Sequence, residues 1–194
     1  MNCLVLTKLK MNKAVFLDRD GVINKKAPEG DYIKSWGEFE FLPGVEDAIK
    51  RLNEEGFLVI VISNQRCVAK GIITEDELNE IHEKMIKELH KKGAVIHGVY
   101  YCPHDVKDHC ECRKPKPGLI LMAARENNVD LGQSWMIGDS ISDVEAGKRA
   151  GCRTVLIGVY PAESGGKFKP NIMAVSLSGA VGEILRCLRN QDLS

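Results

Sequence analysis

The sequence has no excess charge of either sign and no long hydrophobic run. Its 194 residues include 27 lysines and arginines and 27 aspartates and glutamates, so the formal net charge is zero. A balanced charge argues against nucleic-acid binding by bulk attraction to phosphates. No stretch approaches the roughly 20 apolar residues that a membrane-spanning helix needs, and the apolar run within residues 1–6 is too short for a signal peptide. We therefore expect a cytoplasmic protein with no membrane partner and no nucleic-acid partner.

Aromatic residues are also scarce, at 6%, but 44% of the residues are hydrophobic and 28% are charged. This composition is typical of a globular domain and excludes intrinsic disorder. The length corresponds to one domain of ordinary size. We expect residues 13–194 to form a single domain, preceded by an extension at residues 1–12 that joins no periodic pattern.

Seven cysteines are present, and their spacing indicates a metal site more than a disulfide framework. Cys102, Cys110 and Cys112 lie within eleven residues, together with His104 and His109. Thiols in a cytoplasmic protein stay reduced and serve as metal ligands or as small apolar residues. The other cysteines lie apart from this group, and we expect two of them, Cys152 and Cys187, to lie in the core.

Short apolar runs and helical patterns alternate along the chain. The runs predict buried strands at residues 14–17, 57–62, 94–101, 135–138 and 154–157. Apolar spacing, capping residues and terminal glycines predict helices at residues 44–55, 74–92, 117–128, 142–150 and 179–190. The alternation predicts an α/β fold with a doubly wound, mostly parallel, Rossmann-like sheet, in which ligands bind beyond the carboxyl ends of the strands.

Two segments, residues 25–41 and 101–117, lack this periodicity. Residues 25–41 form an unusually long loop, a feature typical of lids and binding segments. Residues 101–117 carry the cysteine and histidine cluster. Residues 163–170, rich in glycine and lysine, predict an exposed loop.

Carboxylates follow two of the predicted strands. Asp18 and Asp20 come directly after the first strand, and side chains two apart on extended backbone point the same way. One carboxylate is suited to nucleophilic attack and the other to acid and base work, while Asp139 supplies a further oxygen ligand. Such a set suits Mg²⁺ better than zinc. Each aspartate alone is equally well read as a turn residue, but together they favour a site.

The spacing Cys102-x-His104 followed by Cys110-x-Cys112 suits a closed tetrahedral zinc site, which makes the zinc structural. The alternative is a set of free surface thiols, and His109 is a rival for the fourth ligand. The remaining histidines, His82, His90 and His97, are interpreted as surface or core residues.

Four motifs in this order resemble the haloacid dehalogenase superfamily of phosphatases. They are Asp18–Asn24, Ser63-Asn64-Gln65, Lys114-Pro115 and Gly138-Asp139-x-x-x-Asp143. The resemblance covers residues 13–160. The segments at 39–45, 102–104 and 110–118 are most similar to a small group containing heptose bisphosphate phosphatases and histidinol-phosphate phosphatases, which carries a zinc loop instead of a large cap domain.

The resemblance implies that the protein hydrolyses the phosphate ester of a small metabolite. Heptose 1,7-bisphosphate is the substrate that it favours most. Asp18 is the implied nucleophile, and Asp20 the implied acid and then base. The Asp18 carboxylate, the Asp20 carbonyl and Asp139 are the implied Mg²⁺ ligands, with Asp143 supporting them. Phosphate and substrate binding are assigned to Ser63, Asn64, Arg113 and Lys114. The family pattern makes the zinc ligands Cys102, His104, Cys110 and Cys112.

Several positions depart from the heptose enzymes. Arg66-Cys67 stands where a small pair is usual, Lys70 replaces an arginine, and Ser140 stands where a lysine is common. Arg66 or Lys70 is a candidate to compensate for the cation missing at Ser140. The reaction is therefore assigned more firmly than the substrate.

The alternatives within the same chemistry are a histidinol-phosphate phosphatase and a broader sugar-phosphate phosphatase. A non-catalytic phospho-acceptor module needs no acid or base at Asp20, and a zinc-stabilised interaction module leaves the aspartates unexplained. A monomer is the default expectation for the oligomeric state.

Overall fold

In the described part of the chain, six parallel strands form one sheet in the order β3-β2-β1-β4-β5-β6. The computed structural model describes residues 11–158 and 167–191. The strands are β1 (Lys13–Leu17), β2 (Phe57–Asn64), β3 (Gly98–Cys102), β4 (Trp135–Gly138), β5 (Arg153–Ile157) and β6 (Ile172–Ala174). The helices are α1 (Val45–Glu54), α2 (Arg66–Ala69), α3 (Glu75–Lys91), α4 (Gly118–Glu126), α5 (Ile141–Ala150) and α6 (Leu177–Gln191). The predicted α/β fold with a parallel, doubly wound sheet is confirmed.

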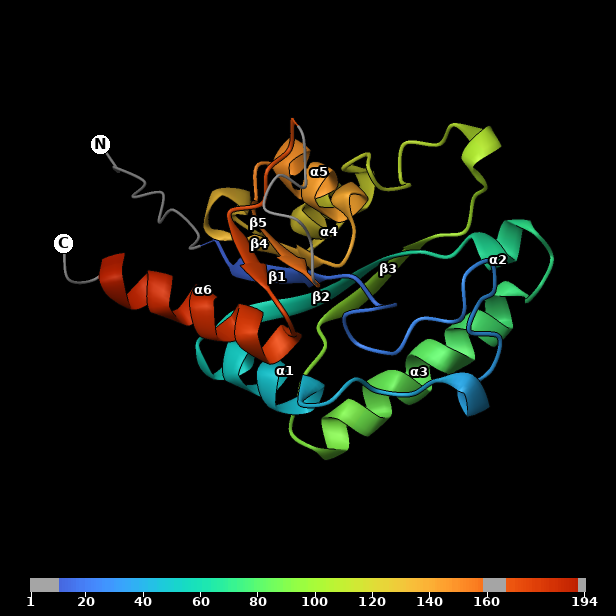
Figure 1. The fold of residues 1–194 in the computed structure, drawn as a ribbon, viewed down its shortest axis with the longest axis horizontal. Coiled ribbons are helices and arrows are strands. Elements are labelled where there is room, and N and C mark those ends of the chain that lie inside the picture. The colour runs from blue at the N-terminus through green and yellow to red at the C-terminus, as the bar shows by residue number, and fades with distance from the viewer. Residues whose placement is uncertain (1–10, 159–166, 192–194) are drawn as a thin grey trace, which may run out of the picture.

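Helices cover both faces of the sheet. Figure 1 shows α1, α3 and α6 below the sheet and α4 and α5 above it. Successive residues of a strand point to opposite faces, and in β1 both sets are fully buried: Val15 and Leu17 pack toward α1, α3 and α6, whereas Ala14 and Phe16 pack toward α4 and α5. This double burial explains why β1 is a continuous apolar run.

The chain reverses its winding direction between β1 and β4. From β1 the order runs through β2 to β3 on one side, and β4, β5 and β6 lie on the other. The loops that follow the carboxyl ends of β1 and β4 therefore diverge, and a crevice opens between them. The residues directly after these two strands are Asp18 and Asp139.

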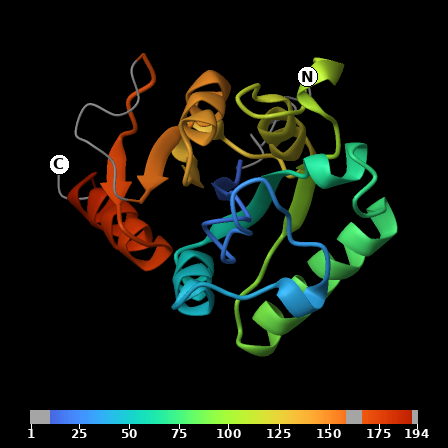
Figure 2. The ribbon, with the colours of Figure 1, turned by 45° about the vertical axis from the view of Figure 1, so that its right-hand side comes forward.

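The predicted loop at residues 25–41 is confirmed as irregular except for a 3₁₀ turn at Trp36–Glu38. It runs from the end of β1 toward α3, as Figure 2 shows in blue and green. Three aromatic rings anchor it, because Trp36 stacks on Phe39 with centroids 5.0 Å apart and Phe41 meets both rings edge-on. The start of this loop carries Lys26, whose Nζ reaches Asp139 at the crevice.

Most predicted elements begin and end within a few residues of the observed ones, but the strand predicted at 94–101 begins only at Gly98. Side chains take the ladder positions before it. The Asn53 amide donates to the Val95 carbonyl and accepts from the Val95 N–H, and His97 Nδ1 accepts from the N–H of Val59. The apolar pattern gave no indication that side chains would replace backbone hydrogen-bond partners here. The pattern also missed the short elements α2 and β6.

Cys152 is buried as predicted, whereas the core prediction for Cys187 is wrong, since this residue is only partly buried on α6. Residues 1–10 of the predicted extension and 163–166 of the predicted exposed loop lie outside the described residues.

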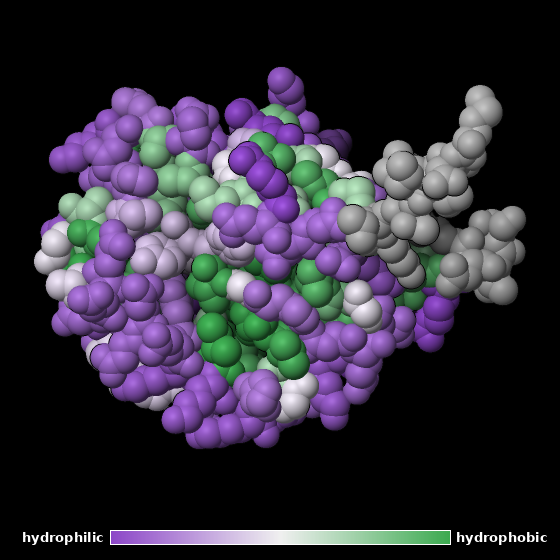
Figure 3. Space-filling model, turned by 180° about the vertical axis from the view of Figure 1, so that it is seen from behind, coloured by the Kyte–Doolittle hydropathy of each residue, from purple (hydrophilic) through white to green (hydrophobic). Residues whose placement is uncertain are grey.

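The reverse side of the molecule is covered mainly by polar side chains, and its hydrophobic side chains gather most densely near the centre of this view (Figure 3). Among residues 11–158 and 167–191, no helix is both long enough and apolar enough to cross a bilayer.

Gly147 allows α5 to pack closely on the sheet, and we expect Gly147→Ala to destabilise the fold. An added Cβ would lie 2.7 Å from both Met136 Cβ and Thr154 Cγ2. Overpacking of this kind costs about 1–3 kcal/mol. The control is Gly182→Ala on α6, where the added Cβ would enter open space, with no described atom beyond the local helix backbone within 4 Å. That change should stabilise the helix by roughly 0.5–1 kcal/mol. Urea unfolding of both variants checks this, and equal stabilisation would contradict close packing at Gly147.

Candidate active site

Three carboxylates meet at the crevice between β1 and β4. Asp18 follows β1, Asp139 follows β4, and Asp143 comes from the first turn of α5. One oxygen from each lies within 4.8 Å of the others. Carboxylate oxygens are the ligands that Mg²⁺ prefers in proteins, so the donor set fits this ion.

Lys114 is buried between two of these carboxylates. Its Nζ lies 2.8 Å from Asp18 Oδ1 and 2.7 Å from Asp143 Oδ1, and it donates to the Ile62 carbonyl at 2.8 Å. Burial alone would lower the pKa of Lys114, but Asp143 and Asp18 outweigh it and raise the pKa above its usual value. Lys114 is therefore a permanent cation whose three N–H donors all have partners.

Asn64 holds the backbone of Lys114 in this position. The Asn64 Oδ1 accepts from the Lys114 N–H, and Asn64 Nδ2 donates to the Lys114 carbonyl, both at 3.1 Å. Asn64, which we predicted to bind phosphate, therefore also fixes the backbone of Lys114.

Burial raises the pKa of Asp18 to about 7, although the charge of Lys114 acts against this increase. Burial likewise raises the pKa of Asp139, against the hydrogen bond and charge of Lys26. Additional positive charge beside these two carboxyl groups would favour their ionised forms.

Asp20 is held by four side-chain nitrogens from three residues. Arg19 Nη2 lies 2.9 Å from Oδ1 and 3.0 Å from Oδ2, and Arg19 Nε lies 3.3 Å from Oδ1. Asn24 donates to Oδ1 and Gln65 to Oδ2, both at 2.9 Å. Burial would raise the pKa of Asp20, but the charge of Arg19 and these hydrogen bonds outweigh it and lower the pKa. The ionised form suits a base, whereas the predicted acid role needs a proton that these donors oppose.

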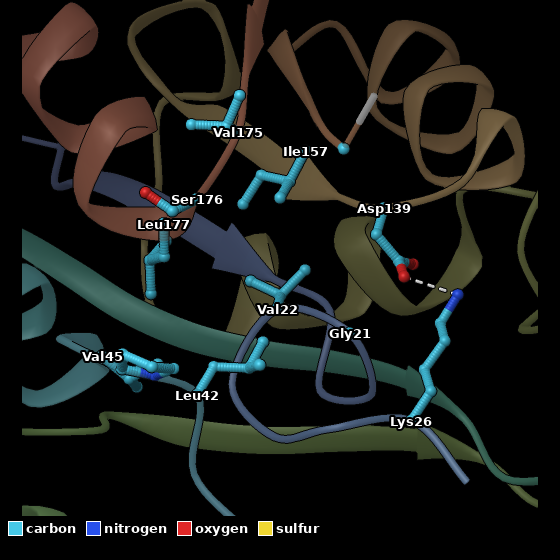
Figure 4. Close-up of a pocket in the computed structure, with 12 residues that line it drawn as sticks. Gly21, Val22, Lys26, Leu42, Val45, Asp139, Ile157, Val175, Ser176 and Leu177 are labelled. Carbon is cyan, nitrogen blue, oxygen red and sulfur yellow. Dashed lines mark ion pairs between the residues drawn. The ribbon is translucent and has the colours of Figure 1, made fainter. Parts of the chain in front are cut away.

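Lys26 belongs to the site although sequence reasoning missed it. Its Nζ lies 2.5 Å from Asp139 Oδ2, at the edge of a hollow of about 590 Å³ (Figure 4). The apolar wall of this hollow comes from Val22, Leu42, Val45, Ile157, Val175 and Leu177. No local pattern relates a lysine in the long loop to an aspartate 113 residues later in the chain.

Gly21 allows this close approach of the loop to Asp139. Its φ is +89°, and an added Cβ would lie 1.9 Å from Asp139 Oδ2. Only glycine adopts this backbone conformation without strain while leaving room for the carboxylate.

Asp18, Asp20 and Asp139 share a pocket of about 210 Å³ with the other predicted site residues Ser63, Asn64 and Lys114. Ser63 is buried, and its Oγ accepts from Gln65 Nε2 at 2.7 Å. Ser140 forms a capping box with Asp143, whose Oδ2 accepts from the Ser140 N–H at 3.0 Å. Ser140 therefore orients Asp143 and supplies no positive charge.

Arg113 lies outside this pocket. It lines an adjacent hollow of about 570 Å³ with Lys116 and Arg149, and its Nη1 donates to the His104 carbonyl at 3.4 Å. The two residues suggested to compensate for Ser140 are committed elsewhere. Arg66 Nε lies 2.6 Å from Asp105 Oδ1, and the Lys70 ammonium lies over the Tyr32 ring.

The four predicted zinc ligands converge. The donor atoms of Cys102, His104, Cys110 and Cys112 lie within 4.8 Å of one another, and the His104 Nδ1 is 3.2 Å from the Cys112 Sγ. His109 stays outside this set, because it ends the 3₁₀ turn Val106–Asp108 with φ of +47°. Within residues 11–158 and 167–191 the group consists of three thiols and one imidazole, which fits a closed zinc site.

We expect wild-type protein to hold about one zinc per chain, as a closed Cys₃His site does. Cys112→Ser removes one ligand and should release the metal to a chelator that the wild type resists. Cys187→Ser, outside the cluster, is the matched control. Atomic emission after dialysis measures the zinc content, and equal content in both variants would rule out this ligand set.

Comparisons with known proteins agree with this geometry. Residues 111–180 match the family model described as HAD hydrolase-like. A D,D-heptose 1,7-bisphosphate phosphatase from B. bronchiseptica, solved with magnesium and phosphate, superposes with a TM-score of 0.79 at 33% identity, over 90% of this chain and 98% of that one. Fold and site thus define a phosphatase of the haloacid dehalogenase class, a phosphoric monoester hydrolase.

Comparison with sequence relatives identifies the family within this class. The D-glycero-beta-D-manno-heptose-1,7-bisphosphate 7-phosphatase of Pasteurella multocida is 36% identical over 87% of this chain and 94% of the relative. The enzyme of the same name from Rhodopseudomonas palustris is 44% identical over 71% of this chain and 79% of its own length. The chain therefore belongs to the D-glycero-beta-D-manno-heptose-1,7-bisphosphate 7-phosphatase family, and the resemblance inferred from the motifs is confirmed.

Proposed function

We propose that this protein is a magnesium-dependent phosphatase that removes the C7 phosphate from D-glycero-D-manno-heptose 1,7-bisphosphate. The observation that carries the proposal is the pocket in which Asp18 lies 2.8 Å from the buried Lys114 and beside Asp139. Relatives with this substrate in their names span most of the chain, which supports the choice of substrate.

The chemistry assigned to the pocket proceeds in two displacements at phosphorus. Asp18 attacks the phosphorus in line, the ester P–O bond breaks, and the leaving alkoxide takes a proton from Asp20. A water molecule then attacks the aspartyl-phosphate, Asp20 takes the proton from this water, and inorganic phosphate leaves. Asp20 returns to its starting protonation state after each turnover.

The Asp18 carboxylate, the Asp20 carbonyl and Asp139 are the proposed Mg²⁺ ligands. When bound, the ion offsets the negative charge of the phosphoryl group and of the carboxylates. Asp143 supports this set from behind, because its two oxygens already contact Lys114 and Ser140.

Ser63, Asn64 and Lys114 are the proposed partners of the phosphoryl oxygens. The Ser63 hydroxyl accepts from Gln65, which leaves its own O–H free to donate. The Asn64 amide has a second N–H beyond the one given to Lys114. Lys114 contributes through its charge, because its donors already have partners.

Arg113 is proposed to bind the part of the substrate that does not react, since the hollow it lines adjoins the pocket through Asn64, Lys114 and Ser142. Structural zinc at the Cys₃His cluster is proposed to fix the loop that carries Arg113. The balanced charge argues against a nucleic-acid partner, and we propose a cytoplasmic monomer.

Asp18→Asn should abolish turnover, because the amide cannot form the acyl-phosphate. Asp20→Asn should slow hydrolysis by roughly 10²–10⁴-fold, the usual contribution of general acid and base catalysis. Phosphate release with Mg²⁺ measures both rates, and circular dichroism confirms that the variants are folded. Activity retained in folded Asp18→Asn would remove this residue as nucleophile.

Substrate preference is tested with both anomers of heptose 1,7-bisphosphate, histidinol phosphate, fructose 1,6-bisphosphate and p-nitrophenyl phosphate. We expect the highest kcat/KM for a heptose anomer. Faster cleavage of histidinol phosphate, or similar slow cleavage of all esters, would assign the site to histidinol phosphate or to sugar phosphates in general. The heptose enzymes commonly have a lysine where this chain has Ser140, so the panel tests whether the substrate differs as well.

A further inference from the structure

Arg19 is a fully buried cation, with 1% of its surface exposed. Its position, between the two aspartates of the first motif, places its guanidinium against Asp20 on one side. On the other side its Nη1 lies 3.1 Å from His82 Nε2. The guanidinium therefore has one carboxylate partner and one imidazole partner.

His82 lies on α3 and has 4% of its surface exposed. Arginine has only donors and stays charged in proteins, so His82 Nε2 must accept this hydrogen bond. The ring is then neutral with its proton on Nδ1. Burial and the charge of Arg19 agree with this state, because they lower the pKa of His82 to about 3.

The hydrogen bond to His82 constrains the other nitrogens of Arg19. A guanidinium is planar and rigid, so the position of Nη1 helps to determine where Nη2 and Nε point. These two nitrogens contact the Asp20 carboxylate at 2.9–3.3 Å. His82 is thus linked to Asp20 through a single rigid group.

Asp20 has two further side-chain donors, Asn24 and Gln65, which belong to the motifs around the pocket. His82 differs from them because it comes from a helix that contributes no residue to the pocket. The start of α3 is fixed by the capping box of Thr74 and Glu77, and the ring of His82 lies 5.4 Å from that of Tyr101. His82 is therefore held in place on α3, and it can restrict the position of the Arg19 guanidinium.

We propose that His82 is a positioning residue for the reaction: its Nε2 holds Arg19 in the orientation that directs the Asp20 carboxyl toward the leaving oxygen. This inference rests on the acid role proposed for Asp20. His82 does not line the pocket, so its effect on the reaction passes through Arg19.

The test compares an ester that needs a proton on its leaving group with one that does not. The first is the alkyl ester of the panel that the wild type cleaves fastest, and the second is p-nitrophenyl phosphate, whose leaving group departs as a stable anion. For both, kcat/KM covers the steps up to formation of the aspartyl-phosphate, and the ratio of the two values cancels the fraction of active enzyme.

His82→Leu removes the acceptor at similar volume, and His82→Gln restores an acceptor. We expect His82→Leu to lower the alkyl-to-aryl ratio about 10-fold, a partial loss of the contribution that a general acid makes. His82→Gln should recover most of the ratio, and His90→Gln at the exposed end of the same helix should leave it unchanged. A proportional loss on both esters, an unchanged ratio in His82→Leu, or no recovery in His82→Gln would overturn the proposal.

Asp20→Asn is the reference that separates the two hypotheses. If Asp20→Asn lowers the ratio and His82→Leu does not, only the positioning role fails. If Asp20→Asn leaves the ratio unchanged, the acid role of Asp20 fails and the positioning role fails with it. Nitrogen NMR of wild-type protein adds a test without any variant, because a protonated Nε2 of His82 at neutral pH would contradict the proposed hydrogen bond.

Discussion

The ion pairs of Lys114 are the interaction on which the rest of the site depends. A buried ammonium without partners is very costly, and this one is stabilised by Asp18, Asp143 and the Ile62 carbonyl. These partners come from the ends of β1 and β2 and from α5. The ammonium is therefore stabilised only when these three segments pack around it. The crevice between β1 and β4 is the place where the parallel sheet allows this meeting.

The cysteine and histidine cluster connects to that interaction through the backbone. Cys112 lies two residues before Lys114, whose backbone is held by Asn64 at the end of β2. The same loop is tied to α2, because Arg66 pairs with Asp105 and the Ala69 N–H donates to the Pro103 carbonyl. A metal that orders the loop would thus act on the buried lysine as well as on Arg113.

The sheet, its helices and the main site residues were predictable because they depend on short-range patterns. Buried runs such as the one ending at Leu17 identify strands, and a carboxylate directly after such a run must lie at the edge where parallel strands end. The start of β3 was not predictable, because the backbone of Val95 pairs with the Asn53 side chain of α1, and the N–H of Val59 on β2 donates to the His97 ring instead of to a backbone carbonyl. The 3₁₀ turn that keeps His109 away from the other metal donors likewise left no sign in the spacing.

The sequence by itself determined the fold class, the motif aspartates, the buried lysine's motif and the zinc-ligand spacing, because each depends on residues close together in the chain. Only the tertiary structure brought Lys26 to Asp139, Gln65 to Asp20 and His82 to Arg19. These contacts join side chains that share no periodic relationship, and they arise where separate elements pack. The orientation and charge of a catalytic carboxyl group depend on such partners, since hydrogen bonds and nearby charges shift its pKa.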